Sequence, residues 1–130
     1  MRRSNEDVVR RFFERPPDSE WPELVDPEIE IHDYDLPDAG VYRGLEGLAR
    51  WAADWEEPWE RWDWNVEEAI EQGNRVLAVF TITARGASGA ETRRRNAMVF
   101  ILRHGKLLRA EYYADPDEAR AATGIPSSSS

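Results

Sequence analysis

The chain has 130 residues, a net charge of −9 and no cysteine. This length suits one domain with one hydrophobic core. The negative charge argues against a nucleic-acid partner, which requires a basic surface, and the lack of cysteine excludes disulfides and thiolate chemistry. No apolar stretch approaches the roughly 20 residues of a membrane span, and no secretory signal pattern begins the chain. We therefore expect a cytoplasmic protein without a membrane partner.

Two helices are predicted at the start of the chain. Ser4 can cap the first together with Asp7, and Pro16 ends it. The apolar positions of this helix recur at helical spacing and are Val8, Val9, Phe12 and Phe13. A second, short helix follows, and its apolar residues are Trp21, Leu24 and Val25.

The first predicted strand covers residues 28–33, where apolar and polar side chains alternate. The buried face of this strand ends in Asp33. A loop at 34–44 then leads into an amphipathic helix at 45–57, which Pro58 ends. The apolar face of that helix consists of Leu45, Leu48, Trp51, Ala52 and Trp55.

Four long strands are predicted in the second half of the chain, at 62–71, 75–85, 92–102 and 106–114. A short helix after Pro116 ends at Gly124, and residues 125–130 are expected to form a disordered tail. Residues 1–124 would then be a single domain. Because the helices come first and the long strands follow, the predicted class is α+β, with helices on the concave face of a curved antiparallel sheet.

The last two strands form a hairpin around Gly105, and its register depends on the turn. With a bulge at the turn, Asn96 faces Tyr112. With a plain two-residue turn, Ala97 faces Tyr112 instead. We favour the bulged register, in which the outer sheet face carries Ala97, Val99, Ile101, Leu107 and Tyr113. An outer face as apolar as this predicts a homodimer.

The aromatic content of six Trp, four Tyr and four Phe predicts an aromatic-lined cavity enclosed by the curved sheet. The candidate ligand-binding residues are Tyr34, Trp51, Trp55, Trp62, Asn96, Met98 and Tyr112. Asn96 and Tyr112 would be the polar groups that orient a small apolar or aromatic ligand. Alternatively, these two side chains satisfy each other or buried backbone groups, and the tryptophans belong to the core.

Five stretches taken together resemble the SnoaL-like branch of the nuclear-transport-factor-2 (NTF2-like) superfamily. They are LVDPEIEIHD at 24–33, GVYRG at 40–44, GNRV at 73–76, VFILRHGK at 99–106 and YAD at 113–115. The resemblance covers about residues 5–124. It implies a cone-shaped α+β barrel, frequent dimers and a pocket at the mouth of the cone. Members include ketosteroid isomerases, polyketide cyclases, epoxide hydrolases, dehydratases and non-catalytic binding domains, so the fold leaves the reaction open.

Asp33 is the candidate catalytic residue, because it ends the buried face of its strand beside the predicted pocket. A carboxylate that has lost water in such a place can act as a general base. The resemblance agrees, since ketosteroid isomerases carry a general-base Asp after this strand. The alternative is that Asp33 caps a turn through its side chain.

Other parts of the enzymatic sites of the superfamily are missing. Phe12 and Phe13 stand where the isomerases offer a Tyr hydroxyl to the substrate, and residues 96–98 (Asn-Ala-Met) stand where they place a protonated Asp. The cyclases place an acid/base Asp and a His at positions that match Tyr112 and Ala110. Neither mechanism is therefore expected in its usual form.

These patterns predict a pocket protein for a small apolar or aromatic molecule. If the protein is an enzyme, we expect cofactor-free acid/base isomerisation, cyclisation or dehydration. No metal is expected, since the two histidines, His32 and His104, lack metal-ligand spacing. The alternative is a non-catalytic ligand-binding or structural dimerisation domain.

Overall fold

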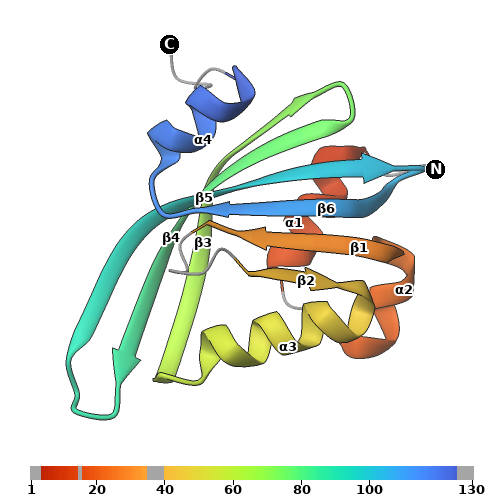
Figure 1. Ribbon diagram of the computed structural model, residues 1–130. Helices are drawn as coiled ribbons and strands as arrows, with labels where there is room; N and C mark the ends of the chain where they lie inside the picture. Colours follow the sequence, from red (N-terminus) through yellow and green to blue (C-terminus); the bar gives the residue numbers. More distant parts are fainter. Residues whose placement is uncertain (1–3, 15, 35–39, 126–130) are drawn as a thin grey trace.

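The computed structural model describes residues 4–14, 16–34 and 40–125. One curved sheet of six strands runs through the molecule in the order β2-β1-β6-β5-β4-β3 (Figure 1). The strands are β1 (Val25–Asp33), β2 (Val41–Arg43), β3 (Trp59–Gln72), β4 (Arg75–Gly86), β5 (Glu91–Arg103) and β6 (Lys106–Tyr113). The helices are α1 (Asn5–Phe13), α2 (Trp21–Leu24), α3 (Gly44–Glu56) and α4 (Pro116–Thr123), with a 3-10 turn, η1 (Asp18–Glu20), before α2. The predicted α+β class is confirmed.

The helices α1, α2 and α3 cover the concave face of the sheet and enclose the main core with it. α1 begins with the predicted capping box: Ser4 Oγ accepts from Asp7 N at 3.1 Å, and Asp7 Oδ2 accepts from Ser4 N at 3.3 Å. The apolar face of α1 is buried as predicted and consists of Val8, Val9, Phe12 and Phe13.

Strand β1 begins at Val25 rather than at Glu28, and it differs from the prediction in a second respect. It pairs with β6 in the parallel direction, so the sheet is mixed and the predicted antiparallel arrangement is wrong for this pair. The β1–β6 register shifts between Val25 and Glu30. Pro27, which has no N–H to donate, lies in that irregular stretch. The edge strand β2 is missing from the predicted elements, because three residues are too few to show an alternation.

The β5–β6 hairpin has a register that neither predicted turn produces. The two-residue turn at 104–105 has positive φ at both positions, as tight hairpin turns require. A bulge beyond it leaves Leu108 unpaired, so that Met98 lies opposite Tyr112. The predicted pairing of Asn96 with Tyr112 is therefore wrong, and the plain two-residue alternative fails beyond the bulge as well.

The same bulge exchanges the faces of the two leucines after the turn. Leu107 belongs to the main core on the concave side, whereas Leu108 lines an outer groove together with Ile101. Beyond the bulge, the partner of Tyr112 is Met98 instead of the predicted Asn96, a shift of two residues. Because side chains alternate with a period of two, those beyond the bulge still lie on the predicted face. Those on the concave side are Met98, Phe100, Ala110 and Tyr112.

The helix α4 covers the outer face of β4 and β5 (Figure 1). Ile125, which follows it, is only 1% exposed, so the prediction of a disordered tail is wrong at this residue; residues 126–130 lie outside the described part. Gly124 ends the helix as predicted, with φ of 74°. The buried outer cluster consists of Leu77, Val79, Ala97, Val99, Ala119 and Ile125.

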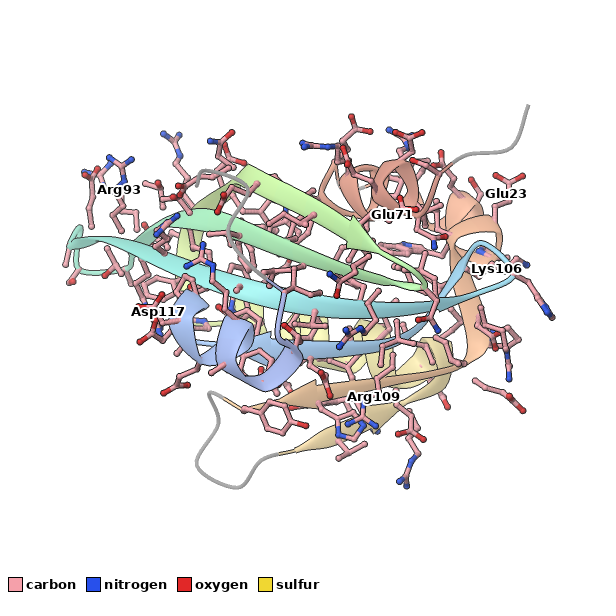
Figure 2. The ribbon with its side chains drawn as sticks, turned by 90° about the horizontal axis from the view of Figure 1, so that it is seen from above. Glu23, Glu71, Arg93, Lys106, Arg109 and Asp117 are labelled. Carbon is pink, nitrogen blue, oxygen red and sulfur yellow. The ribbon has the colours of Figure 1, made fainter. Side chains whose placement is uncertain are left out.

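An ion pair joins α4 to the sheet. Arg120 Nη2 lies 3.0 Å from Glu68 Oε2 on β3. Figure 2 shows α4, marked by Asp117, against the middle of the sheet, between the sheet ends marked by Arg93 and Lys106.

Much of the apolar face that led to the dimer prediction is thus covered within one chain. The homodimer stays a prediction. Of the residues of β5 and β6 on which it was based, Ala97 and Val99 are buried in the cluster with Ala119 of α4, and Leu107 lies in the main core.

Candidate functional site

Aromatic rings fill the centre of the cone. Phe13 on α1 contacts Trp64 and Phe80, with ring centroids 4.9 Å apart in each pair, and lies 5.9 Å from Phe100. Phe12, also on α1, contacts Phe100 of β5, with ring centroids 5.4 Å apart. The described rings therefore pack closely against one another at this level, and open space lies to one side of them.

That space is a cavity of about 510 Å³ between α1, α2, α3 and β3. Its volume falls within the range of about 300–1,000 Å³ that is usual for small-molecule sites. Glu56 is the one ionisable side chain among the lining residues that the structure describes. The lining consists of Phe12, Pro16, Trp21, Pro22, Leu45, Leu48, Ala49, Trp51, Ala52, Ala53, Glu56, Trp62 and Trp64.

Asp33 lies behind the wall of this cavity and is 3% exposed. Its Oδ2 accepts a hydrogen bond of 2.8 Å from Nε1 of Trp51, and the Trp51 ring lines the cavity. The predicted burial of Asp33 is confirmed, but its carboxylate reaches the cavity through the indole rather than directly. Burial also raises the pKa of the nearby Tyr42 phenol, and the negative charges of Asp54 and Asp33 act in the same direction.

Three of the predicted ligand-binding residues lie deeper in the core. Asn96, Met98 and Tyr112 are almost fully buried on the concave side of β5 and β6, and none of them lines the cavity. Asn96 Nδ2 donates to the Ala114 carbonyl at 2.8 Å, while its Oδ1 has no partner among the described residues. The Tyr112 ring centroid lies 6.2 Å from that of Trp51, so Tyr112 packs against the cavity wall from the side of the core.

The other four predicted ligand-binding residues divide into two pairs. Trp51 and Trp62 line the cavity. Trp55 packs behind Trp62, with ring centroids 4.8 Å apart, and is not part of the lining. Tyr34 is 44% exposed and stacks on Tyr113, 5.1 Å away, on the outer side of the sheet. Residues 35–39 of the loop predicted at 34–44 lie outside the described part.

No cluster of three or more His, Asp or Glu side chains suited to a metal occurs within residues 4–14, 16–34 and 40–125. His32 Nε2 lies 3.0 Å from Glu30 Oε1, on the strand face opposite Asp33. In the same described part, no helix is long and apolar enough to cross a membrane.

Comparison with known proteins decides the family. A profile of the SnoaL-like domain matches residues 6–110. The chain belongs to the SnoaL-like domain family. No curated protein sequence gives a significant match.

Solved structures agree with this SnoaL-like assignment at the level of the fold. An NTF2-like protein from Burkholderia pseudomallei is 17% identical with a TM-score of 0.74, and the alignment covers 92% of this chain and 97% of that one. TerC, co-crystallised with polyporic acid, is 19% identical with a TM-score of 0.72, covering 90% and 95%. A protein of ketosteroid isomerase-like fold from Catenulispora acidiphila, in complex with trimethylamine, is 14% identical with a TM-score of 0.69, covering 92% and 94%.

The SnoaL-like domain has cavity residues that sequence reasoning did not select as ligand-binding. Phe12 was predicted on the apolar face of the first helix and Trp21 in the short second helix, and Trp64 is absent from the candidate ligand-binding residues. Trp64 follows Trp62 by two positions on one strand, so its presence on the same face was the available signal. Glu56 gave no signal, since an acidic residue near the end of an amphipathic helix is ordinarily exposed.

The contact between Asp33 and Trp51 should contribute strongly to the stability of this SnoaL-like domain. We expect Trp51→Phe to lower the free energy of unfolding by about 2–4 kcal/mol, because the buried carboxylate loses a charge-assisted donor in addition to ring contacts. Chemical denaturation measures this. Trp55→Phe is the matched control, since the Trp55 ring packs on Trp62 and Trp64 without such a bond, and about 1 kcal/mol is expected there. If Trp51→Phe and Trp55→Phe lowered the free energy of unfolding equally, the hydrogen bond from Trp51 to Asp33 would not be a major source of stability.

Proposed function

We propose that this protein binds a small, largely apolar or aromatic molecule in the cavity between α1, α2, α3 and β3. The observation that carries the proposal is the cavity itself, about 510 Å³ in volume and walled by indole and phenyl rings. Removing a flat apolar ligand from water into such a site is favourable by roughly 25 cal/mol for each Å² of apolar surface buried. Ring contacts with the indoles add to this and orient the ligand.

The comparisons support a small-molecule site in this fold. TerC was crystallised with polyporic acid, and the Catenulispora acidiphila protein was crystallised with trimethylamine. Both relatives share the fold of this chain at low sequence identity, so they support the kind of function without identifying the ligand. The proposal for this chain rests on its own cavity.

Filling the cavity tests the proposal. Ala52 on α3 lines the cavity and packs against the main core, so Ala52→Trp would place an indole in the ligand volume. We expect this variant to keep its fold and to lose at least tenfold in affinity for aromatic ligands, as measured by tryptophan fluorescence and calorimetry. Ala121→Trp is the matched control, since Ala121 is an exposed residue of α4 outside the cavity lining.

The outcome is decided by the difference between these two variants. If Ala52→Trp and Ala121→Trp bind aromatic molecules as well as the unaltered protein does, the cavity is not the binding site. If the unaltered protein binds no apolar or aromatic molecule, the proposal fails as a whole.

A second candidate function is cofactor-free acid/base catalysis with Asp33 as the general base. The observation that favours it is a carboxylate removed from water and held by the N–H of a cavity-lining indole. A general base must come within hydrogen-bond reach of the proton it removes, directly or through one water. Catalysis would therefore require Trp51 to turn away when a substrate enters.

Proton transfer is measurable without knowledge of the natural substrate. We expect an acid/base enzyme to exchange the α-protons of a bound aromatic ketone with deuterated solvent, and Asp33→Asn to stop the exchange while ketone binding persists. If no exchange above the solvent rate occurs for bound ketones, ligand binding alone remains.

A further inference from the structure

We propose that the ligand of this cavity is a hydrophobic cation, such as an aromatic or alkyl ammonium compound. The inference rests on the proposed binding function and specifies the chemical class of its ligand. Three features of the described residues support it: the ring surfaces of the walls, the charge of the lining, and the end of α3.

The walls present aromatic ring surface from several sides. Trp21 comes from α2, Trp51 from α3, and Trp62 and Trp64 from β3. Trp51 Nε1 donates to Asp33, and Trp64 Nε1 donates to the Phe13 carbonyl at 2.6 Å. The N–H groups of these two rings are therefore engaged within the protein, and what the rings contribute to the lining is apolar aromatic surface. Indole faces are the best aromatic partners for a cation.

The charge of the lining points the same way. Glu56 is half-buried at the cavity, and no Lys, Arg or His occurs among the lining residues that the structure describes. In the same described part, the Glu56 carboxylate makes no ion pair of 4.0 Å or less. An anionic ligand would meet this carboxylate without a compensating positive group, whereas a cation would pair with it across a partly desolvated gap.

The end of α3 reinforces this preference. Glu56 is the last residue of the helix, where unpaired carbonyl groups carry partial negative charge. Basic residues in the last turn stabilise a helix, but α3 has none there. Asp54 and Glu57 instead add further negative charge beside Glu56. A bound cation would relieve this unfavourable arrangement, and the overall charge of −9 would favour its approach.

A pair of probes of the same shape separates charge from hydrophobicity. Benzyltrimethylammonium and neopentylbenzene differ only in a nitrogen or carbon atom at the branch point, and phenylacetate supplies the opposite charge. We expect the protein to bind benzyltrimethylammonium about fivefold to thirtyfold more tightly than neopentylbenzene, as measured by calorimetry, and to bind phenylacetate more weakly than either.

Two variants locate the source of the preference. Glu56→Gln should lower the ratio between the affinities for the cation and for its neutral counterpart by at least threefold. Glu57→Gln makes the same change in net charge at the neighbouring exposed residue, outside the lining, and should leave the ratio within about twofold. An intact circular dichroism spectrum shows that each variant is folded.

Each result has a distinct meaning. A cation preference that depends on Glu56 supports the proposal. Equal binding of cation and neutral probe, or a preference that Glu56→Gln leaves unchanged, overturns the cation inference while the binding function stands. If none of the three probes binds, the proposed function itself fails.

Discussion

Phe100→Ala should lower the free energy of unfolding by about 3–5 kcal/mol, close to the usual cost of emptying a buried ring site. Phe100 is fully buried in the middle of β5, and its ring contacts Phe12 and Phe13 on α1. Its removal would separate α1 from the sheet at the point where the interior is filled by aromatic rings. Denaturation with urea or guanidinium measures the loss.

Val41→Ala serves as the control for this change, because Val41 is a large apolar residue of β2 that is exposed. A loss within about 0.5 kcal/mol is expected there. If Phe100→Ala cost no more than Val41→Ala, the aromatic filling of the cone would be wrong. The cavity could then no longer be placed to one side of these rings.

Ile125→Ala should lower the free energy of unfolding by about 2–4 kcal/mol, since Ile125 packs with Ala119 over the outer face of β4 and β5. Removing its side chain would uncover apolar surface of Leu77 and Val79, which belong to the same cluster. Ile125→Val provides the graded comparison, with an expected loss of about 0.5–1.5 kcal/mol. Thermal and chemical unfolding measure both changes.

The two substitutions at Ile125 also separate the packed arrangement from a disordered tail. In a disordered tail both would leave stability unchanged within error. A loss from Ile125→Ala that exceeds the loss from Ile125→Val is the result expected of a packed side chain.

Much of the fold was predictable because its signals are local. The alternation from Ile29 to Asp33 predicted the buried face of β1, and the spacing of Leu48, Trp51 and Ala52 predicted the covered side of α3. Gly124, at which the last helix was predicted to end, has a positive φ. Each of these signals depends on residues that are close in sequence, so the pattern alone was sufficient.

The errors arise from choices that depend on tertiary packing. The bulge at Leu108 turns Leu107 into the core, which no alternation pattern of the hairpin could indicate. The placement of Ile125 follows from an apolar sheet face that only the assembled sheet presents. The parallel pairing of β1 with β6 joins strands far apart in the chain. The spacing of residues along the sequence does not indicate whether two such strands pair parallel or antiparallel.

The candidate site was predictable in part for the same reason. Trp51 and Trp62 lie on the faces that periodicity indicated, and both line the cavity. The depth of each residue was not predictable, because the rings of α1 and β4 occupy the space that Asn96 and Tyr112 were expected to share with a ligand. Asp33 lies behind Trp51, to which it is hydrogen-bonded, and does not line the cavity itself.

The central claim is that a small apolar molecule occupies the cavity between α3 and β3. A crystal structure with ring-brominated neopentylbenzene, the neutral probe, tests it most directly, since anomalous scattering locates the bromine atom. At a concentration that saturates the protein in solution, we expect the bromine peak inside the cavity, in contact with the ring of Trp21 or Trp62. A cavity without a peak, or a peak only in the outer groove beside Pro27 and Arg109, would contradict the claim.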